Sequence, residues 1–260
     1  MNRSIVAQTA FKSKVGQLDA LALAELLDKT LLESRETGKH TTKKTFSPSS
    51  VGYGNGTCPR RWYISFDGAE FHDNFDSLGL ANMSNGTYVH ERWQTLFEST
   101  GVLVETEKEI LCEDPPIRGF ADLIIDWEGK EIVGEIKSSK NEMFAYRKNR
   151  MTPTAYHLVQ LLIYMEVLGM DEGFFLYEDK NEMKIVVIPI FMTEENKKLV
   201  TRVFEWMRGV HGTWRNQILP ERPFTKRSKE CAGCPVRKAC WSGDKYGEGD
   251  VKLPKLVLPK

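Results

Sequence analysis

Two short apolar runs joined by a polar turn constrain the fold of this chain more than any other feature. Residues 117–126 and 131–138 are rich in β-branched side chains, and Gly129 lies in the polar gap between them, a pattern typical of a β-hairpin. A two-residue turn at Glu128 and Gly129 fixes the register of both strands along their length. The sequence therefore predicts which side chains face each other across the hairpin.

This register places Asp122 directly opposite Glu135, with Cβ atoms about 4.5–5.5 Å apart, and Lys137 on the same face. Two carboxylates this close repel each other and do not both stay ionised without help. A hard divalent cation such as Mg²⁺ or Mn²⁺ resolves the conflict, and a lysine beside it can hold or deprotonate a water molecule. The simpler interpretation is a hairpin with solvated charges on its outer face.

The composition excludes several classes of protein. With 41% hydrophobic and 28% charged residues the chain can bury a core, and its net charge of zero means that any nucleic-acid surface must be local. The first residues lack the apolar segment of a secretory signal, and no apolar run approaches the length of a membrane span. Five cysteines, three of them close together near the C-terminal end, favour metal ligation in a reducing compartment. We expect a cytoplasmic protein that binds no membrane.

The N-terminal part carries two features that could contact other molecules. Residues 17–35 have the leucine spacing of an amphipathic helix, which either packs onto the main body or binds a partner protein. Residues 36–50 are expected to form an exposed basic connection able to contact a phosphate backbone. Their basic side chains are Lys39, His40, Lys43 and Lys44. The serines and glycines that follow predict a loop, after which Cys58 begins a helix or strand rich in aromatic residues.

A predicted helix before the hairpin carries a histidine beside its apolar stripe. Residues 84–99 have helical spacing of apolar side chains, with Ser84 or Asn85 as the cap. His90 lies one turn beyond Gly86, where a missing side chain leaves space beside the imidazole. By itself such a histidine is most often a packed or half-exposed residue.

A second predicted helix follows the hairpin after a basic stretch. Residues 137–150 carry many more bases than acids, which indicates either a solvated face or a track for phosphates. Residues 153–168 form a largely apolar helix, capped by Thr152 and ended by Gly169. Its polar exceptions, which share one face, are Gln160 and Tyr164.

Further strands complete the predicted core. Residues 102–112, 173–178 and 183–190 have strand patterns, and residues 194–216 form a long amphipathic helix. The order β, β, β, α, β, β, α indicates an α/β fold with the hairpin near its centre. Cys112, in the first strand and without a cysteine partner, is expected to be a small buried residue.

Three of the other cysteines lie near the C-terminal end and one lies before the core. Cys231, Cys234 and Cys240 leave a tetrahedral metal site one ligand short, and Cys58 is the natural fourth. Zinc and a [4Fe–4S] cluster both accept four thiolates. Zinc modules are the commoner, but they usually carry two Cys-x-x-Cys pairs, and Cys58 stands alone. Free buried thiols are the remaining alternative.

An Asp in one strand followed by Glu-x-Lys in the next resembles the signature of the PD-(D/E)XK nuclease superfamily. Here the motif is Asp122 and Glu135-Ile136-Lys137, with Ala121 in place of the usual proline. The helical pairs Gly86/His90 and Gln160/Tyr164 resemble RecB-like members of this superfamily. One cysteine before the core and three after it resembles its iron–sulfur nucleases, among them CRISPR-associated RecB-like exonucleases. The resemblance covers about residues 47–241.

The resemblance implies a restriction-endonuclease-like core with a central mixed sheet flanked by helices, and a cysteine cluster that staples its N- and C-terminal parts together. It implies that Mg²⁺ or Mn²⁺ is held by His90, Asp122, Glu135 and the Ile136 carbonyl. Lys137 then orients the attacking water, and Gln160 and Tyr164 support the water or the DNA strand. It also implies a [4Fe–4S] cluster, with zinc as the alternative, on Cys58, Cys231, Cys234 and Cys240.

We therefore predict a metal-dependent DNA nuclease, an exonuclease by resemblance, acting on single strands or free ends in repair, recombination or phage DNA processing. The expected organisation is an N-terminal helix and basic linker at 1–46, a nuclease domain at 47–241 and an extended tail at 242–260. Two alternatives stay open: a non-catalytic DNA-binding or scaffold protein with this fold, and a redox-sensing iron–sulfur protein.

Overall fold

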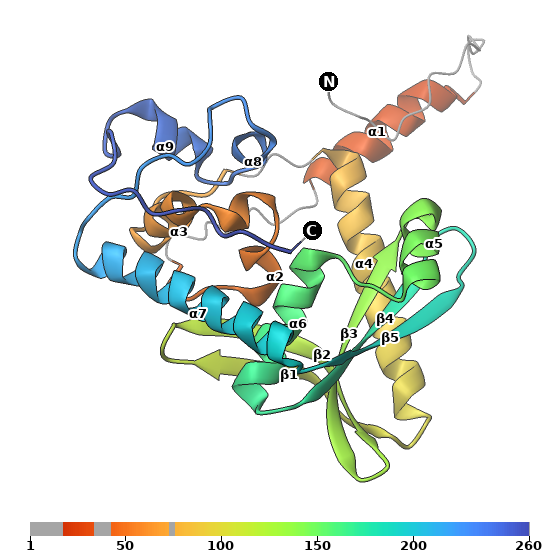
Figure 1. Ribbon diagram of the computed structural model, residues 1–260. Helices are drawn as coiled ribbons and strands as arrows, with labels where there is room; N and C mark the ends of the chain where they lie inside the picture. Colours follow the sequence, from red (N-terminus) through yellow and green to blue (C-terminus); the bar gives the residue numbers. More distant parts are fainter. Residues whose placement is uncertain (1–17, 34–42, 73–75, 260) are drawn as a thin grey trace.

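A computed structural model describes residues 18–33, 43–72 and 76–259 (Figure 1). These residues form one five-stranded sheet with the strand order β1-β2-β3-β4-β5. The strands are β1 (Leu103–Cys112), β2 (Ile117–Trp127), β3 (Lys130–Ser139), β4 (Glu172–Asp179) and β5 (Ile185–Phe191). β3 and β4 run parallel and the other neighbours run antiparallel, so the sheet is mixed, as predicted.

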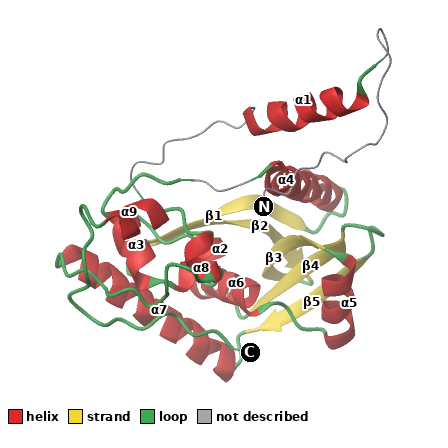
Figure 2. Cartoon of the chain, turned by 90° about the horizontal axis from the view of Figure 1, so that it is seen from above, coloured by secondary structure: helices red, strands yellow, loops and turns green. Residues whose placement is uncertain are grey.

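Helices cover both faces of this sheet (Figure 2). α4 lies on one face, and α6 and α7 lie on the other. The parallel step from β3 to β4 passes through α5 and α6, because parallel neighbours need a crossover connection. The longer helices are α1 (Ala20–Glu33), α3 (Pro59–Phe66), α4 (Ser77–Glu98), α5 (Asn141–Arg150), α6 (Ala155–Leu168) and α7 (Glu194–Arg215). The short ones are α2 (Pro48–Val51), η1 (Gly54–Thr57), α8 (Lys229–Ala232) and α9 (Arg237–Ser242).

Alternate side chains of the central strands feed two hydrophobic cores. Leu123 and Ile136 pack with Val89 of α4 on one face. Ile124, the residue after Leu123, and Val133, three residues before Ile136, belong to the larger core that α6 and α7 complete on the other face. The near-continuous apolar runs of β2 and β3 follow from this, since a strand covered on both faces has no solvent side.

The hairpin has the predicted register. Trp127 pairs with Lys130, and Leu123 pairs with Gly134. Glu128 and Gly129 form the two-residue turn with φ of 55° and 83°. Two residues with positive φ give a turn whose twist matches that of the strands.

The predicted start of the helix that carries His90 is wrong. α4 begins at Ser77, and its cap is Asp76, whose side chain accepts the N–H of Gly79 at 2.8 Å. Ser84 and Asn85 therefore lie inside the helix. Gly79 and Asn82, which are weak helix formers, lie in the first two turns, and the apolar spacing becomes regular only later in the segment.

Two further helix predictions need correction. α6 begins at Ala155 with Thr154 at the cap position, two residues later than predicted, so Pro153 precedes the helix. Its end is as predicted, with Gly169 in the left-handed region at φ 68°. The basic stretch after β3 forms α5, which charge alone did not indicate.

The ends of the core differ from expectation in detail. The predicted loop after Ser47 contains α2 and η1. Cys112 is half-buried against the main core, not fully buried as predicted. Residues 252–259 have no helix or strand, and Leu256 is only 7% exposed and donates its N–H to the Thr57 carbonyl at 2.9 Å. Lys39 and His40 lie outside the described residues.

α1 is the predicted amphipathic helix, shortened by a few residues at each end. None of its residues is buried, and it contacts α4. Its leucines do not join either core, so the expectation that they pack onto the main body is wrong for most of them. No helix among the described residues is long and apolar enough to cross a membrane.

We expect Leu27→Ser to change the free energy of unfolding by less than about 0.5 kcal/mol, because this side chain is 58% exposed. Leu161→Ala in α6 should lower it by about 2–5 kcal/mol, because Leu161 is fully buried and its truncation leaves a cavity. Urea unfolding of both variants measures the difference. A large loss for Leu27→Ser would mean that α1 is part of the cooperative core.

Candidate active site

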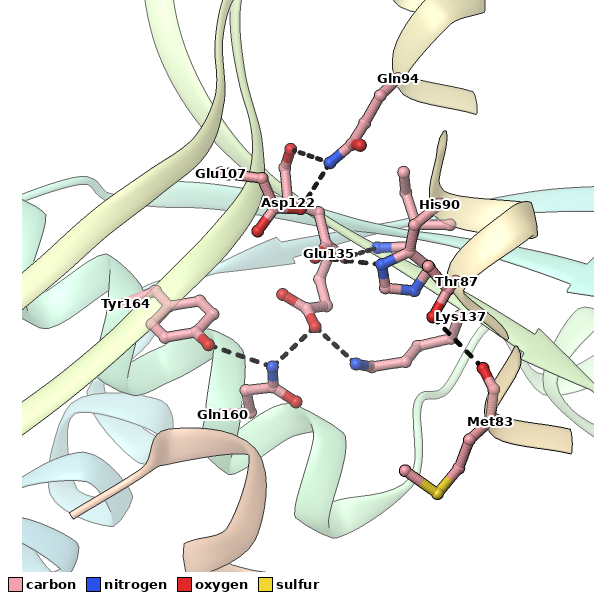
Figure 3. Close-up of polar contacts among 11 residues, drawn as sticks. Met83, Thr87, His90, Gln94, Glu107, Asp122, Glu135, Lys137, Gln160 and Tyr164 are labelled. Atoms are coloured by element: carbon pink, nitrogen blue, oxygen red, sulfur yellow. Dashed lines mark hydrogen bonds and ion pairs between the residues drawn. The ribbon is translucent and has the colours of Figure 1, made fainter. Parts of the chain in front are cut away.

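The two carboxylates of the hairpin lie where β2 and β3 separate (Figure 3). The last pair of the ladder at this end is Leu123 with Gly134, so Asp122 and Glu135 lie one step beyond it. The backbone N–H of Ile136 donates to Oδ2 of Asp122 at 2.7 Å. A side chain thus replaces a backbone group at the point of separation and fixes Asp122 against β3.

α4 holds Asp122 from the other side. Nδ1 of His90 lies 3.3 Å from Oδ1 of Asp122. Asp122 is buried, with only 6% of its surface exposed. Burial opposes the charged imidazole, but the hydrogen bond and charge of Asp122 outweigh it and raise the pKa of His90. Gln94, one turn further along α4, donates to the Asp122 carbonyl at 3.1 Å and to Glu107 at 2.7 Å. A methyl group added at Gly86 would meet no atom within 4 Å, so the space expected beside His90 is open.

Glu135 is 1% exposed, and its two oxygens have different surroundings. Oε1 accepts from Nζ of Lys137 at 2.5 Å and from Nε2 of Gln160 at 2.6 Å. Oε2 is buried and has no hydrogen-bond partner. The pKa of Glu135 is raised to about 7, mainly by burial. The charge of Lys137 lowers this pKa and the charge of Asp122 raises it further. A buried carboxylate oxygen without a donor is costly, and a bound cation would satisfy it.

Lys137, Gln160 and Tyr164 complete the polar floor of the site. Burial disfavours the charged Lys137, but the nearby carboxylates outweigh burial and raise its pKa. Gln160 donates to Tyr164 Oη at 3.2 Å, and burial raises the pKa of that phenol. Lys137 therefore stays protonated and Tyr164 stays neutral near pH 7. A Cβ at Gly119 would lie 3.2 Å from the Tyr164 ring and 3.0 Å from Pro48, so a glycine here lets α6 and α2 approach β2 closely.

All six side chains predicted for the catalytic site line one cleft of about 450 Å³. They are His90, Asp122, Glu135, Lys137, Gln160 and Tyr164. The side chain of Ile136, also predicted through its carbonyl, points away into the core beneath α4. Four separate elements, β2, β3, α4 and α6, thus bring together residues spread over more than seventy positions of sequence.

Other walls of the cleft were not predicted. They are formed by Thr45, Ser47, Pro48, Ser49, Arg118, Gly119 and Phe120. Arg118 and Phe120 precede Asp122 by four and two positions, so strand alternation alone could have placed them on its face. The segment 45–49 reaches the cleft because Phe46 pairs with the start of β2 and is fully buried. No local pattern signals a contact of that range.

The two carboxylates suit a hard divalent cation, which prefers oxygen ligands, and the imidazole of His90 can add a nitrogen donor. As the side chains stand, no group of three or more His, Cys, Asp or Glu within residues 18–33, 43–72 and 76–259 is arranged to hold a metal ion. Glu135 turns Oε1 toward Lys137, whose ammonium group neutralises it. The unpartnered Oε2 is the atom that a cation would satisfy.

The fold brings the four cysteine-bearing segments together. Cys58 is at the cap position of α3, and the other three lie in and around α8 and α9. Asn55 of η1 donates to the carbonyl of Gly233 at 2.9 Å. Burial raises the pKa of Cys58 to about 12, and the neighbouring thiols of the C-terminal group add to this shift. Burial likewise raises the pKa of Cys234 to about 11. All four are free cysteines, and the predicted cluster is not shown by their arrangement.

Comparison with known proteins identifies the family. Residues 87–241 match the profile of the PD-(D/E)XK nuclease superfamily. The chain belongs to this superfamily. The match covers more than half of the chain and includes the six cleft residues and the three C-terminal cysteines.

One solved structure supports the fold, and two more are similar to this chain at lower scores. The alkaline exonuclease LHK-Exo from Laribacter hongkongensis superposes with a TM-score of 0.51 at 13% identity, over 66% of this chain and 91% of that one. LHK-Exo in complex with dAMP has a TM-score of 0.49 at 14% identity, over 66% of this chain and 89% of that one. A protein described as SSO0001 gives 0.42 at 20% identity, over 85% and 96%. No curated protein sequence matches the chain.

The pKa of Glu135 makes a prediction about stability without metal. Its folded value of about 7 exceeds the ordinary 4.5, so the folded state binds a proton that the unfolded state loses, and wild-type stability falls as pH rises between these values. In EDTA, the unfolding free energy of Glu135→Gln minus that of wild type should therefore rise by about 2–3 kcal/mol from pH 5 to pH 8. Lys137 is charged at both pH values. The contact with Lys137 that Glu135→Gln loses therefore cancels when the values at pH 5 and pH 8 are compared. A difference independent of pH would contradict the buried, proton-binding carboxylate.

Proposed function

We propose that the chain is a metal-dependent DNA nuclease that acts as an exonuclease on single strands or free ends. The observation that carries this proposal is the buried Oε2 of Glu135, which lacks a donor and lies beside Asp122 and Lys137 in the cleft of a PD-(D/E)XK chain. Solvated hairpin charges would be exposed, whereas these two carboxylates are 6% and 1% exposed. Burying two carboxylates side by side is unfavourable unless a cation that binds between them compensates their charge.

Mg²⁺ or Mn²⁺ held by His90, Asp122, Glu135 and the Ile136 carbonyl would polarise the scissile phosphodiester and lower the pKa of the attacking water. Lys137 is protonated, so it acts as a donor: it orients the water and stabilises negative charge on the phosphate. Gln160 holds Oε1 of Glu135 and is itself backed by Tyr164. The N–H of Ile136 keeps Asp122 aimed into the cleft.

The outer walls of the cleft suit a nucleic-acid strand. The hydroxyls of Thr45, Ser47 and Ser49 and the guanidinium of Arg118 are donors appropriate for phosphate oxygens. Phe120 is 45% exposed at the same mouth and offers a ring face on which an unpaired base can stack. An exposed stacking residue beside the site supports single strands or frayed ends as substrate.

Exonuclease activity itself rests on the resemblance to RecB-like nucleases and on the description of LHK-Exo as an exonuclease. We extend the same resemblance to a role in repair, recombination or phage DNA processing in the cytoplasm. The domain division proposed is 1–46, 47–241 and 242–260, with α1 available for a protein partner.

The second metal centre of the proposal is a [4Fe–4S] cluster, with zinc as the alternative, on Cys58, Cys231, Cys234 and Cys240. Its support is that the four segments lie together, with the thiols of the C-terminal group close enough to act on the pKa of Cys58. This centre would join the two ends of the core.

Asp122→Asn and Glu135→Gln should each lower Mg²⁺-dependent cleavage of end-labelled linear DNA at least about 100-fold, because each removes a charge that holds the cation. Glu131→Gln, an exposed change in the same strand as Glu135, is the matched control and should retain wild-type rates. Linear and circular substrates, with Mg²⁺, Mn²⁺ or EDTA, test exonuclease against endonuclease action. Wild-type cleavage by folded Glu135→Gln would exclude the site, and cleavage of circular DNA would exclude a strict exonuclease.

His90→Ala should raise the Mn²⁺ concentration needed for half-maximal cleavage by about tenfold or more, because one donor to the cation is lost. The rate at saturating Mn²⁺ should fall less. Titrating Mn²⁺ against the initial rate separates the two effects. An unchanged half-maximal concentration would make His90 a structural partner of Asp122 only.

A further inference from the structure

Arg61 is a buried cation without matching acceptors. It lies in α3, all of whose eight residues are buried, and it is 7% exposed. Its Nε and Nη1 atoms are buried and have no hydrogen-bond partner. Guanidinium groups in protein interiors are normally paired, since an uncompensated buried charge costs several kcal/mol. The position of Arg61 therefore needs a physical reason.

Its neighbour Arg60 in the same helix is also buried, but both of its Nη atoms have acceptors and only its Nε lacks one. Arg60 is 1% exposed, and its two Nη atoms donate to backbone carbonyls at 2.6–3.2 Å. The carbonyls belong to Pro220, Tyr246 and Gly247. Arg60 thus links α3 to the C-terminal segment through neutral carbonyl groups. Arg61 makes no such link.

The surroundings of Arg61 are already short of negative charge. Its guanidinium stacks on the ring of Trp62 at 4.1 Å, and Lys43 lies 5.5 Å from the same ring. Within the described residues no carboxylate forms an ion pair with Arg61. The groups whose negative form acts on it are the thiols of Cys58 and Cys234.

We propose that Arg61 is the counter-cation of an anionic metal centre bound by Cys58, Cys231, Cys234 and Cys240. Four thiolates around Zn²⁺ or an iron–sulfur cluster leave a net negative charge in a buried place. Loading deprotonates the thiols and releases their protons to solvent. The guanidinium of Arg61, in the helix that Cys58 caps, then offsets this negative charge. This inference rests on the cysteine centre of the proposed function and not on DNA cleavage.

The proposal makes Arg61 act with opposite sign in the two states of the protein. In metal-free protein the guanidinium is an unpaired buried charge, so replacing it by an uncharged side chain of similar length relieves the fold. In loaded protein the same replacement leaves the thiolates without a counter-charge. A residue that only packs would weaken both states.

The experiment compares Arg61→Met with Arg60→Met as the matched control. Full-length protein is purified without oxygen, and iron and zinc are counted by elemental analysis. Metal release to excess chelator is then followed by absorbance for iron or with a zinc-sensitive dye. Thermal unfolding is recorded for loaded protein and for protein stripped by the chelator.

Arg61→Met should release metal about tenfold faster or more, the effect of removing one partner of a buried charge pair. Its melting temperature should fall when loaded and stay level or rise when stripped. Arg60→Met should lower both melting temperatures, because its carbonyl partners lose their donors in either state. Equal losses in both states for Arg61→Met, or unchanged metal release, would overturn the proposal, as would wild-type protein that neither carries nor binds metal at the cysteines. Cleavage of DNA by the wild-type protein is measured separately. Its absence would exclude the proposed nuclease function and would leave the result on Arg61 unaffected.

Discussion

The hydrogen bond from the N–H of Ile136 to the carboxylate of Asp122 holds the point at which β2 and β3 part. Past Leu123 and Gly134 the two strands no longer pair. The backbone N–H of Ile136 in β3 donates to the side chain of Asp122 instead of to a backbone carbonyl of β2. The parting leaves room between β2 and β3, where Glu135 and Lys137 face the cleft. If the ladder continued, backbone pairing would occupy that N–H and Asp122 would lose the bond that aims it.

Buried charge at this point requires rigid support, and helix α4 provides part of it. Glu178 of β4, 1% exposed, accepts from Nε1 of Trp93 at 2.6 Å and also pairs with Arg92. These two residues follow His90 within one turn of the helix, so the bonds to β4 hold the same stretch of α4 that faces Asp122. The chain anchors its histidine through neighbours on the helix, and the imidazole itself stays half-exposed to the cleft.

Much of the fold was readable from the sequence because its signals are local. The period of the apolar runs gave the strands, and the turn at Gly129 fixed the register that sets Asp122 against Glu135. What failed was also local in cause. Gly79 and Asn82, which are weak helix formers, hid the start of α4 at Ser77, and Pro153 was placed inside α6 although it precedes the cap.

The parts of the site that no sequence pattern predicted are those made by distant contacts. The orphaned Oε2 of Glu135 depends on how Lys137 and Gln160 share the other oxygen, and that is a matter of rotamers and not of spacing. The wall at 45–49 depends on Phe46 pairing with β2. The unmatched guanidinium of Arg61 could be recognised only from burial, since a Cys-Pro-Arg-Arg sequence says nothing about acceptors.

One line of contacts joins the cysteine region to the cleft. Gly233, between Cys231 and Cys234, accepts from Asn55 of η1. η1 packs against α2 so tightly that a Cβ on Gly56 would come within 1.5 Å of the Ser50 carbonyl oxygen. α2 in turn forms a wall of the cleft. A metal centre that joins Cys58 to the C-terminal group would therefore fix η1 at both ends, and through α2 it would hold the cleft wall against β2. The gain from closing such a long loop grows only slowly with its length, so the main effect of the centre on the cleft would be this local bracing.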